Sequence, residues 1–139
     1  MIFFTDRDLG RIFPDILEAS GLEVRRHADL FRHDATDEEW LSEVGRNGWF
    51  AISRDRRIYY RPNEKEAVIR AKAALFIVVG KAPHRELAGN FARSIRVVER
   101  FARRHEPPFI ARVYRPSGSG AQGPQTGPGR VALWYPDGR

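Results

Sequence analysis

Short apolar runs alternate along this chain with longer segments whose apolar residues recur at helical spacing. The runs that read as strands are residues 2–5, 22–25, 49–53, 75–79 and 109–114. The segments that read as amphipathic helices are residues 9–19, 36–45, 66–74 and 86–104. Strands alternating with helices predict βαβ units, so we expect an α/β fold of three layers, α/β/α, around a mainly parallel sheet.

Local signals support several of these boundaries. Thr36 precedes a run of acids, and Glu39 stands three residues later, which predicts a capping box at the start of that helix. Gly21 predicts the end of the first helix, and Gly45 the end of the second. The last helix, 86–104, is expected to be continuous and is the longest in the chain.

A change of composition near residue 116 divides the chain. Residues 1–115 hold the alternating pattern and predict one domain, which suits a length of 139 residues. Residues 116–130 are rich in Gly and Pro and predict a loop. Residues 131–139 follow as a strand or tail, and we expect 131–135 to return antiparallel to the strand at 109–114.

A GxGxxG match at residues 118–123 lies inside this loop. A dinucleotide-binding fingerprint needs a strand before those glycines and an amphipathic helix after them. Pro124 and Pro128 prevent a helix from starting there. The match therefore predicts no dinucleotide site.

Composition excludes several classes of chemistry. The chain contains no Cys, which rules out disulfides, thiolate zinc sites and cysteine nucleophiles. Its start, MIFFTDRDLG, places acids after a few apolar residues, so we expect no signal peptide. The longest apolar run, residues 73–79, is far shorter than the roughly 20 residues of a membrane helix. We expect a cytoplasmic protein without a membrane partner.

Charge is distributed unevenly along the chain. Residues 1–55 contain 7 Lys and Arg against 12 Asp and Glu, a net charge of −5. Residues 56–139 contain 17 against 6, a net charge of +11. This asymmetry is typical of an acidic centre beside a basic surface that attracts a polyanion, and equally of a solvated face in an Arg-rich protein.

Carboxylates follow the expected strands. Asp6 comes directly after the first strand, Asp55 comes just after the third, and Asp37 and Glu38 open the second helix. In open α/β sheets, ligands bind beyond the carboxyl ends of the strands, so these acids are expected to share one rim. Clustered carboxylates repel one another, and a hard cation such as Mg²⁺ relieves that repulsion. Each acid taken singly also suits a helix start or a turn, which leaves a non-catalytic α/β binding or regulatory module as the alternative.

Three sequence segments carry a family resemblance. The segments FFTDRDL (3–9), DEEW (37–40) with Phe31 before it, and GWFAISRD (48–55) resemble a PIN-like domain of the VapC toxin type. The resemblance extends over roughly residues 2–115. It implies a Mg²⁺- or Mn²⁺-dependent ribonuclease that acts as a toxin and is held inactive by a cognate antitoxin protein.

The resemblance also implies roles for particular acids. Asp6, Asp37 and Asp55 would be metal ligands and catalytic residues, with Glu38 as a further catalytic acid, and Asp8 is a substitute for Asp6. The larger superfamily usually has a fourth acid near the later strands, where this chain has Gly80 and Lys81. One-metal and two-metal chemistry therefore both stay open.

Basic and aromatic residues supply the candidates for substrate binding. Those expected to hold the RNA backbone are Arg54, Arg56 and Arg57 beside Asp55, and Arg93, Arg96 and Arg100, which share one helix face with Arg103. Ordinary solvation explains both groups as well. Tyr59 and Tyr60 would stack on unpaired bases or cover the sheet edge, and the second is favoured. A homodimer stays open.

Overall fold

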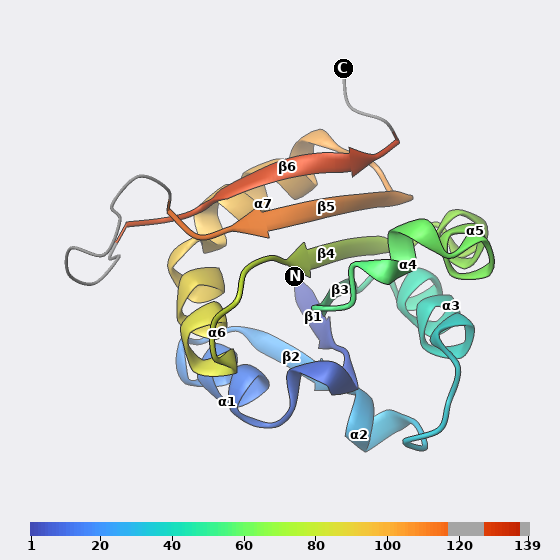
Figure 1. Ribbon diagram of the computed structural model, residues 1–139, viewed down its shortest axis with the longest axis horizontal. Coiled ribbons are helices and arrows are strands. Elements are labelled where there is room, and N and C mark those ends of the chain that lie inside the picture. Colours follow the sequence, from blue (N-terminus) through green and yellow to red (C-terminus); the bar gives the residue numbers. More distant parts are fainter. Residues whose placement is uncertain (117–126, 137–139) are drawn as a thin grey trace.

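A six-stranded sheet forms the centre of the protein in the computed structural model, which describes residues 1–116 and 127–136. Its strands are β1 (Ile2–Thr5), β2 (Glu23–Arg26), β3 (Phe50–Ser53), β4 (Ala74–Val78), β5 (Phe109–Tyr114) and β6 (Arg130–Tyr135). They lie in the order β2-β1-β3-β4-β5-β6, with β1 to β5 parallel and β6 antiparallel to β5 (Figure 1). The expected α/β class, its mainly parallel sheet and the antiparallel last strand are confirmed. Residues 117–126, which include the whole GxGxxG match, and residues 137–139 lie outside the described residues.

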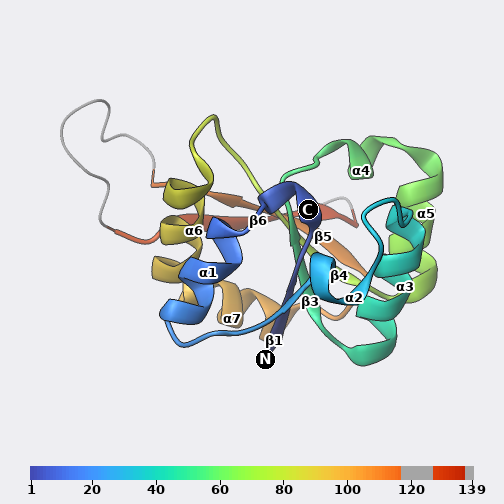
Figure 2. The ribbon, with the colours of Figure 1, turned by 90° about the horizontal axis from the view of Figure 1, so that it is seen from below.

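Helices cover both faces of this sheet. They are α1 (Ile12–Ala19), α2 (His27–Leu30), α3 (Asp37–Asn47), α4 (Arg57–Tyr60), α5 (Pro62–Ala71), α6 (His84–Arg93) and α7 (Ile95–Arg104), with a 3₁₀ turn, η1, at Arg7–Leu9. Figure 2 shows α1, α6 and α7 on one side of the strands and α3, α4 and α5 on the other. The three layers that the sequence predicts are therefore present. None of the helices in residues 1–116 and 127–136 is long and apolar enough to cross a membrane.

Two apolar cores hold the layers together. Side chains alternate along a strand, so Phe3 and Phe76 face α1, α6 and α7, whereas Phe4 and Leu75 face α3 and α5. All four are essentially inaccessible to solvent. Burial of each contributes roughly 1.5–3 kcal/mol. The sheet is thus anchored on both faces, and its carboxyl edge is held rigidly enough to position side chains.

The start of α3 agrees with the sequence, and its end does not. Thr36 Oγ1 accepts a hydrogen bond from the Glu39 N–H at 3.2 Å, and the Glu39 carboxylate accepts one from the Thr36 N–H at 2.7 Å. The helix continues past Gly45 to Asn47 and ends at Gly48, which has a positive φ of 68°. Gly45 serves packing instead, because a Cβ there would meet the Ala71 carbonyl oxygen of α5 at 1.9 Å.

Two other helices have boundaries that differ from expectation. The segment expected to be helical from residue 9 forms η1 first, and α1 begins at Ile12, after Gly10 adopts a positive φ of 67°. The helix expected over 66–74 begins earlier, at Pro62, which suits the first helical position. It ends at Ala71 because Lys72 adopts the left-handed conformation with φ 55°.

The expected single helix over 86–104 is wrong. It is broken at Ser94, which is completely buried between α6 and α7 and has ψ 8°. Ser94 Oγ accepts a hydrogen bond from the Gly129 N–H at 2.8 Å, which ties the break to the segment entering β6. The bend lets α6 pack on α1 while α7 follows β6.

Candidate active site

Acidic side chains from four elements gather at the carboxyl edge of β1 and β3. Thr5 pairs with Ile52, so the two strands end side by side, with Asp6 after one and Asp55 after the other. The first turns of α3 and α5 supply Asp37 and Glu64. These acids surround an open pocket of about 740 Å³, which is also lined by Arg7, Asp8, Asp34, Ala35, Thr36, Glu38, Arg57, Arg61, Pro62 and Asn63.

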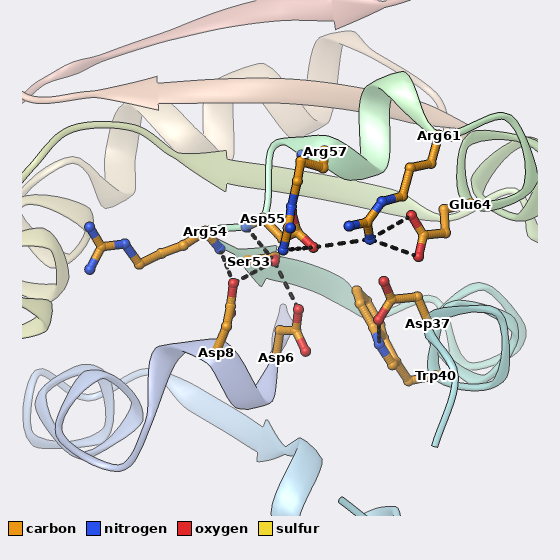
Figure 3. A network of polar contacts seen from close by, with 10 residues as sticks. All are labelled: Asp6, Asp8, Asp37, Trp40, Ser53, Arg54, Asp55, Arg57, Arg61 and Glu64. Atoms are coloured by element: carbon orange, nitrogen blue, oxygen red, sulfur yellow. Dashed lines mark hydrogen bonds and ion pairs between the residues drawn. The ribbon is translucent and has the colours of Figure 1, made fainter. Parts of the chain in front are cut away.

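Ser53, the last residue of β3, links three of the acid-bearing segments (Figure 3). Its Oγ donates to Asp6 Oδ2 at 2.8 Å and lies 3.3 Å from Asp8 Oδ2. The same Oγ accepts the Asp55 N–H at 3.0 Å. A hydroxyl has one proton, so the two carboxylates share a single donor at this point.

Burial and mutual repulsion make Asp6 and Asp8 poor places for negative charge. Burial, together with the charge of Asp8, raises the pKa of Asp6 to about 7. Burial also raises the pKa of Asp8 to about 6, although the Arg54 N–H donates to Asp8 Oδ2 at 3.0 Å. The other oxygen, Asp8 Oδ1, is buried and has no hydrogen-bond partner in the described part of the chain. A cation at this edge would therefore offset the unfavourable free energy of burying these carboxylate charges close together.

Asp37 and Glu64 form a second acidic pair across the pocket. The Trp40 indole N–H donates to Asp37 Oδ1 at 2.9 Å, and because Trp40 is fully buried this fixes the carboxylate at the start of α3. Burial raises the pKa of Glu64, and the hydrogen bond and the charge of Asp37 raise it further. Two acids from separate helices are thus in contact, and the Arg61 guanidinium pairs with Glu64 at 3.3 Å.

Asp55 is paired with two arginines, one of which also pairs with Glu64. The Arg57 N–H and Nε–H both donate to Asp55 Oδ1, at 3.0 and 2.9 Å. The Arg61 guanidinium lies 3.7 Å from Asp55 Oδ2 and 3.3 Å from Glu64. Both arginines keep much of their side chain exposed, so they are able to meet an anion in the pocket.

The donor set suits a hard cation, although it is not assembled around a point. All donors are carboxylate oxygens, which Mg²⁺ and Mn²⁺ prefer, and the unpartnered Asp8 Oδ1 adds an uncompensated one. Within residues 1–116 and 127–136, no three acids or histidines converge closely enough to hold a metal ion. The acids are held apart by Ser53, Trp40 and the two arginines.

The structure brings together some of the residues that the sequence singles out. Asp6, Asp37, Glu38, Asp55 and Arg57 all line the pocket, and so does Asp8, the substitute for Asp6.

Other candidate residues for substrate binding lie elsewhere. Arg54 turns toward His84 and the Gly80 carbonyl, at 3.1 Å from each, and Arg56 is exposed outside the pocket lining. Arg93 ends α6, whereas Arg96 and Arg100 are exposed on α7, across the sheet from α3 and α5 (Figure 2). The expected continuous stripe is therefore divided by the break at Ser94 and does not adjoin the acids.

Sequence reasoning missed Ser53, Arg61 and Glu64. Ser53 is the one polar residue of β3, a signal that was readable once Asp55 was suspected. Pro62 predicts a helix start, which would have placed Glu64 in a first turn at the same edge. Arg61 carries no signal of this kind, because its role depends on how α4 and α5 meet.

The two tyrosines behave differently from each other. Tyr59 stacks on Trp134 of β6, with ring centroids 4.0 Å apart, and so covers the outer hairpin of the sheet, as favoured from the sequence. Tyr60 is 68% exposed and meets the same rings edge-on.

Comparison with known proteins places the chain in a family. The family model described as "PIN like domain" matches residues 1–80, which contain β1 to β4 and all the acids of the pocket. Comparisons with the curated proteins and with the solved structures found no match. Since the family match covers more than half of the 139 residues, the chain belongs to the PIN-like domain family.

Proposed function

We propose that this chain is a Mg²⁺- or Mn²⁺-dependent ribonuclease that hydrolyses RNA phosphodiester bonds and acts as the toxin of a type II toxin–antitoxin pair. The observation that carries the nuclease proposal is the pair of buried carboxyl groups, Asp6 and Asp8, that share the Ser53 hydroxyl beside Asp37 and Asp55. Buried carboxyl groups with raised pKa values occur preferentially at functional sites, where catalysis or ligand binding uses them. Family membership agrees with this chemistry, since nuclease activity is common among PIN-like domains.

Asp6, Asp37 and Asp55 would hold the cation, directly or through water, and Asp8 and Glu38, which line the same pocket, would assist. When bound, a divalent cation offsets charge on phosphoryl oxygens and supplies an activated water for in-line attack. Ser53 holds Asp6 and Asp8 in fixed orientations, and Trp40 does the same for Asp37.

Arg57 and Arg61 would bind the substrate phosphate. Both now neutralise Asp55, and a phosphate entering the pocket competes for the same guanidinium groups. Transfer of the arginines from Asp55 to the phosphate frees a carboxylate at the moment when substrate arrives. Substrate and cation binding would then support each other.

The toxin role rests on the sequence resemblance of FFTDRDL, DEEW and GWFAISRD to toxins of the VapC type. The excess of acids in the pocket also suits inhibition by a basic side chain of an antitoxin segment. We therefore expect a small basic partner protein that co-purifies with this chain and suppresses its activity.

The nuclease proposal is tested with a 5′-labelled single-stranded RNA incubated with purified protein in Mn²⁺, in Mg²⁺ and in EDTA. Cleavage is expected with either metal and not in EDTA, and it should be lost in Asp6→Asn and Asp55→Asn. Glu99→Gln, which removes a carboxylate from α7, is the matched control and should cleave normally. Full cleavage by both Asn variants would instead favour the non-catalytic binding module.

The toxin role needs its own test. Induced expression of the chain in a bacterial host should arrest growth, and Asp55→Asn should not. Co-expression with the product of a neighbouring small open reading frame should restore growth and yield a complex. Normal growth with active enzyme present would refute the toxin role and leave the ribonuclease.

A further inference from the structure

A second pocket lies beside the acidic one, on the side of β2. It has a volume of about 460 Å³, within the range of small-ligand sites, and its lining includes Asp6, Arg7, Arg11, Arg26, His27 and Asp29. Asp6 and Arg7 line both pockets, so the two pockets adjoin each other at the carboxyl edge of the sheet. An RNA chain bound at the acids would extend past Asp6 and Arg7 into this second pocket.

His27 is the unusual side chain of this pocket. It is the first residue after β2 and is only 2% exposed. Neither Nδ1 nor Nε2 has a hydrogen-bond partner within the described residues. The ring is held in place by aromatic neighbours, with centroids 6.2 Å from Phe4 and 5.4 Å from Phe31. Two buried polar atoms without hydrogen-bond partners lower the stability of the fold, which suggests that they serve another purpose.

The chemistry of the ring restricts what it can bind. Burial lowers the pKa of His27, and the charge of Arg7 lowers it further, which favours the neutral form. A neutral imidazole has one N–H donor and one bare nitrogen acceptor. A hydroxyl is able to pair with either nitrogen, by donating to the bare one or by accepting from the N–H, whereas a phosphate oxygen pairs only with the N–H.

The charged residues around His27 include two arginines that are able to bind a phosphate. Arg26 is already paired with Asp15 and Glu18. Arg7 and Arg11 are exposed and form no ion pair with a described residue, so they are available to a phosphate. Two carboxylates also line the pocket, Asp6 at its border with the acidic pocket and Asp29 on its exposed rim.

We propose that the pocket of His27 binds the ribonucleotide next to the cleaved bond, with His27 on the ribose 2′-hydroxyl and Arg7 and Arg11 on its phosphate. This inference rests on the proposed ribonuclease function and adds to it the residue that distinguishes RNA from DNA. The 2′-hydroxyl is the group by which a protein can make that distinction at a single site.

The test measures binding without cleavage. In an Asp55→Asn background and in EDTA, fluorescence anisotropy gives the affinity for a labelled eight-nucleotide RNA and for DNA of the same sequence. His27→Phe keeps the ring on Phe4 and Phe31 and removes both nitrogens. We expect RNA affinity to fall about tenfold and DNA affinity less than about twofold, as for loss of a hydroxyl-specific contact. Thermal stability should be unchanged or higher, because two unpartnered polar atoms are removed.

Matched variants separate the pocket from general effects. His105→Phe, at another histidine stacked on a phenylalanine, should change neither affinity. Arg11→Gln should weaken RNA and DNA alike, whereas Arg70→Gln on α5 should weaken neither. Unchanged RNA affinity in His27→Phe, equal losses for RNA and DNA, or no RNA preference in the parent would each overturn the inference. Cleavage by the wild-type protein is scored separately, so failure here leaves the ribonuclease proposal standing.

Discussion

The carboxyl edge of β1 and β3 and the outer face of α6 and α7 both concentrate like charges, and they hold them in opposite ways. At the edge, Asp6 and Asp8 are largely buried, share one hydroxyl and have raised pKa values. On the helices, Arg93, Arg96, Arg100 and Arg103 are exposed and form no ion pair with any described residue. Solvent screens the repulsion among the arginines, whereas the buried carboxylates at the edge continue to repel each other.

This difference teaches how to separate a site from a charged surface. A stripe of arginines costs the fold little, because each guanidinium remains hydrated. Buried acids weaken the fold unless something offsets them, so their retention is informative. We therefore assign chemistry to the carboxyl edge of β1 and β3, and solubility to the arginines of α6 and α7.

Replacement of an edge acid is expected to have the largest effect. Asp6→Asn or Asp55→Asn should lower the rate of RNA cleavage by about 10³-fold or more, because each removes an oxygen that the charge-stabilising site needs. Circular dichroism should show an intact fold in both. Replacement of three arginines on α6 and α7 should lower the cleavage rate far less. An equally large fall would place the chemistry on the helices instead of the edge.

The stability of the metal-free protein should depend on the charge of Asp6. Its pKa is about 7 in the fold and ordinarily 3.8, so the unfolded chain ionises first as the pH rises. Ionisation of Asp6 therefore stabilises the unfolded state relative to the folded state between about pH 4 and pH 7, and the free energy of unfolding falls in that window.

Asp6→Asn should remove this loss and be more stable than the wild type by about 4 kcal/mol at pH 8 in EDTA, and nearly equal to it near pH 4. Urea titrations at the two pH values measure the difference. A constant difference at both pH values would mean that Asp6 carries no buried charge.

Ser53→Ala should weaken cation binding by a smaller amount. The hydroxyl lowers the pKa values of both Asp6 and Asp8, so its removal leaves more of each protonated at pH 7. Mn²⁺ affinity at pH 7 should fall about tenfold and recover at pH 9, since the acids are then ionised in either protein. Ser42→Ala, on the exposed face of α3, is the control and should bind as the wild type.

The smallest effect is expected from the arginines of the helices. The triple change of Arg93, Arg96 and Arg100 to Gln should alter RNA cleavage by less than about twofold, because solvent already screens these side chains. The dependence of RNA affinity on salt should also keep its slope. A slope flatter by about 0.7 for each arginine removed would restore them as phosphate contacts.

The sequence allowed the layers, the parallel sheet and most of the pocket acids to be predicted, for physical reasons. Alternating periodicity fixes the order of strands and helices, and strand ends fix where Asp6 and Asp55 emerge. The capping box at Thr36 placed Asp37 in a first turn. Each of these signals is local, so a single sequence is enough to read it.

The remaining features depend on contacts between distant segments. Ser94, at the break between α6 and α7, is hydrogen-bonded to Gly129, which lies 35 positions further along the chain. Arg54 follows Ser53 next to the acids in sequence, and its side chain nevertheless turns to His84 and Gly80. His27 looked ordinary because its burial between Phe4 and Phe31 depends on how β2 and α2 pack. The periodicity of the sequence carries no information about contacts between segments that are far apart in the chain.

The central claim is that the repelling acids of the edge form a cation site, and Mn²⁺ binding tests it most directly. Electron paramagnetic resonance measures free Mn²⁺ as protein is titrated at pH 7.5, without RNA or any activity. We expect the wild type and Glu99→Gln to bind Mn²⁺ alike, and Asp6→Asn and Asp55→Asn to bind it at least about tenfold more weakly. Equal binding by all four proteins, or no binding by the wild type, would contradict it.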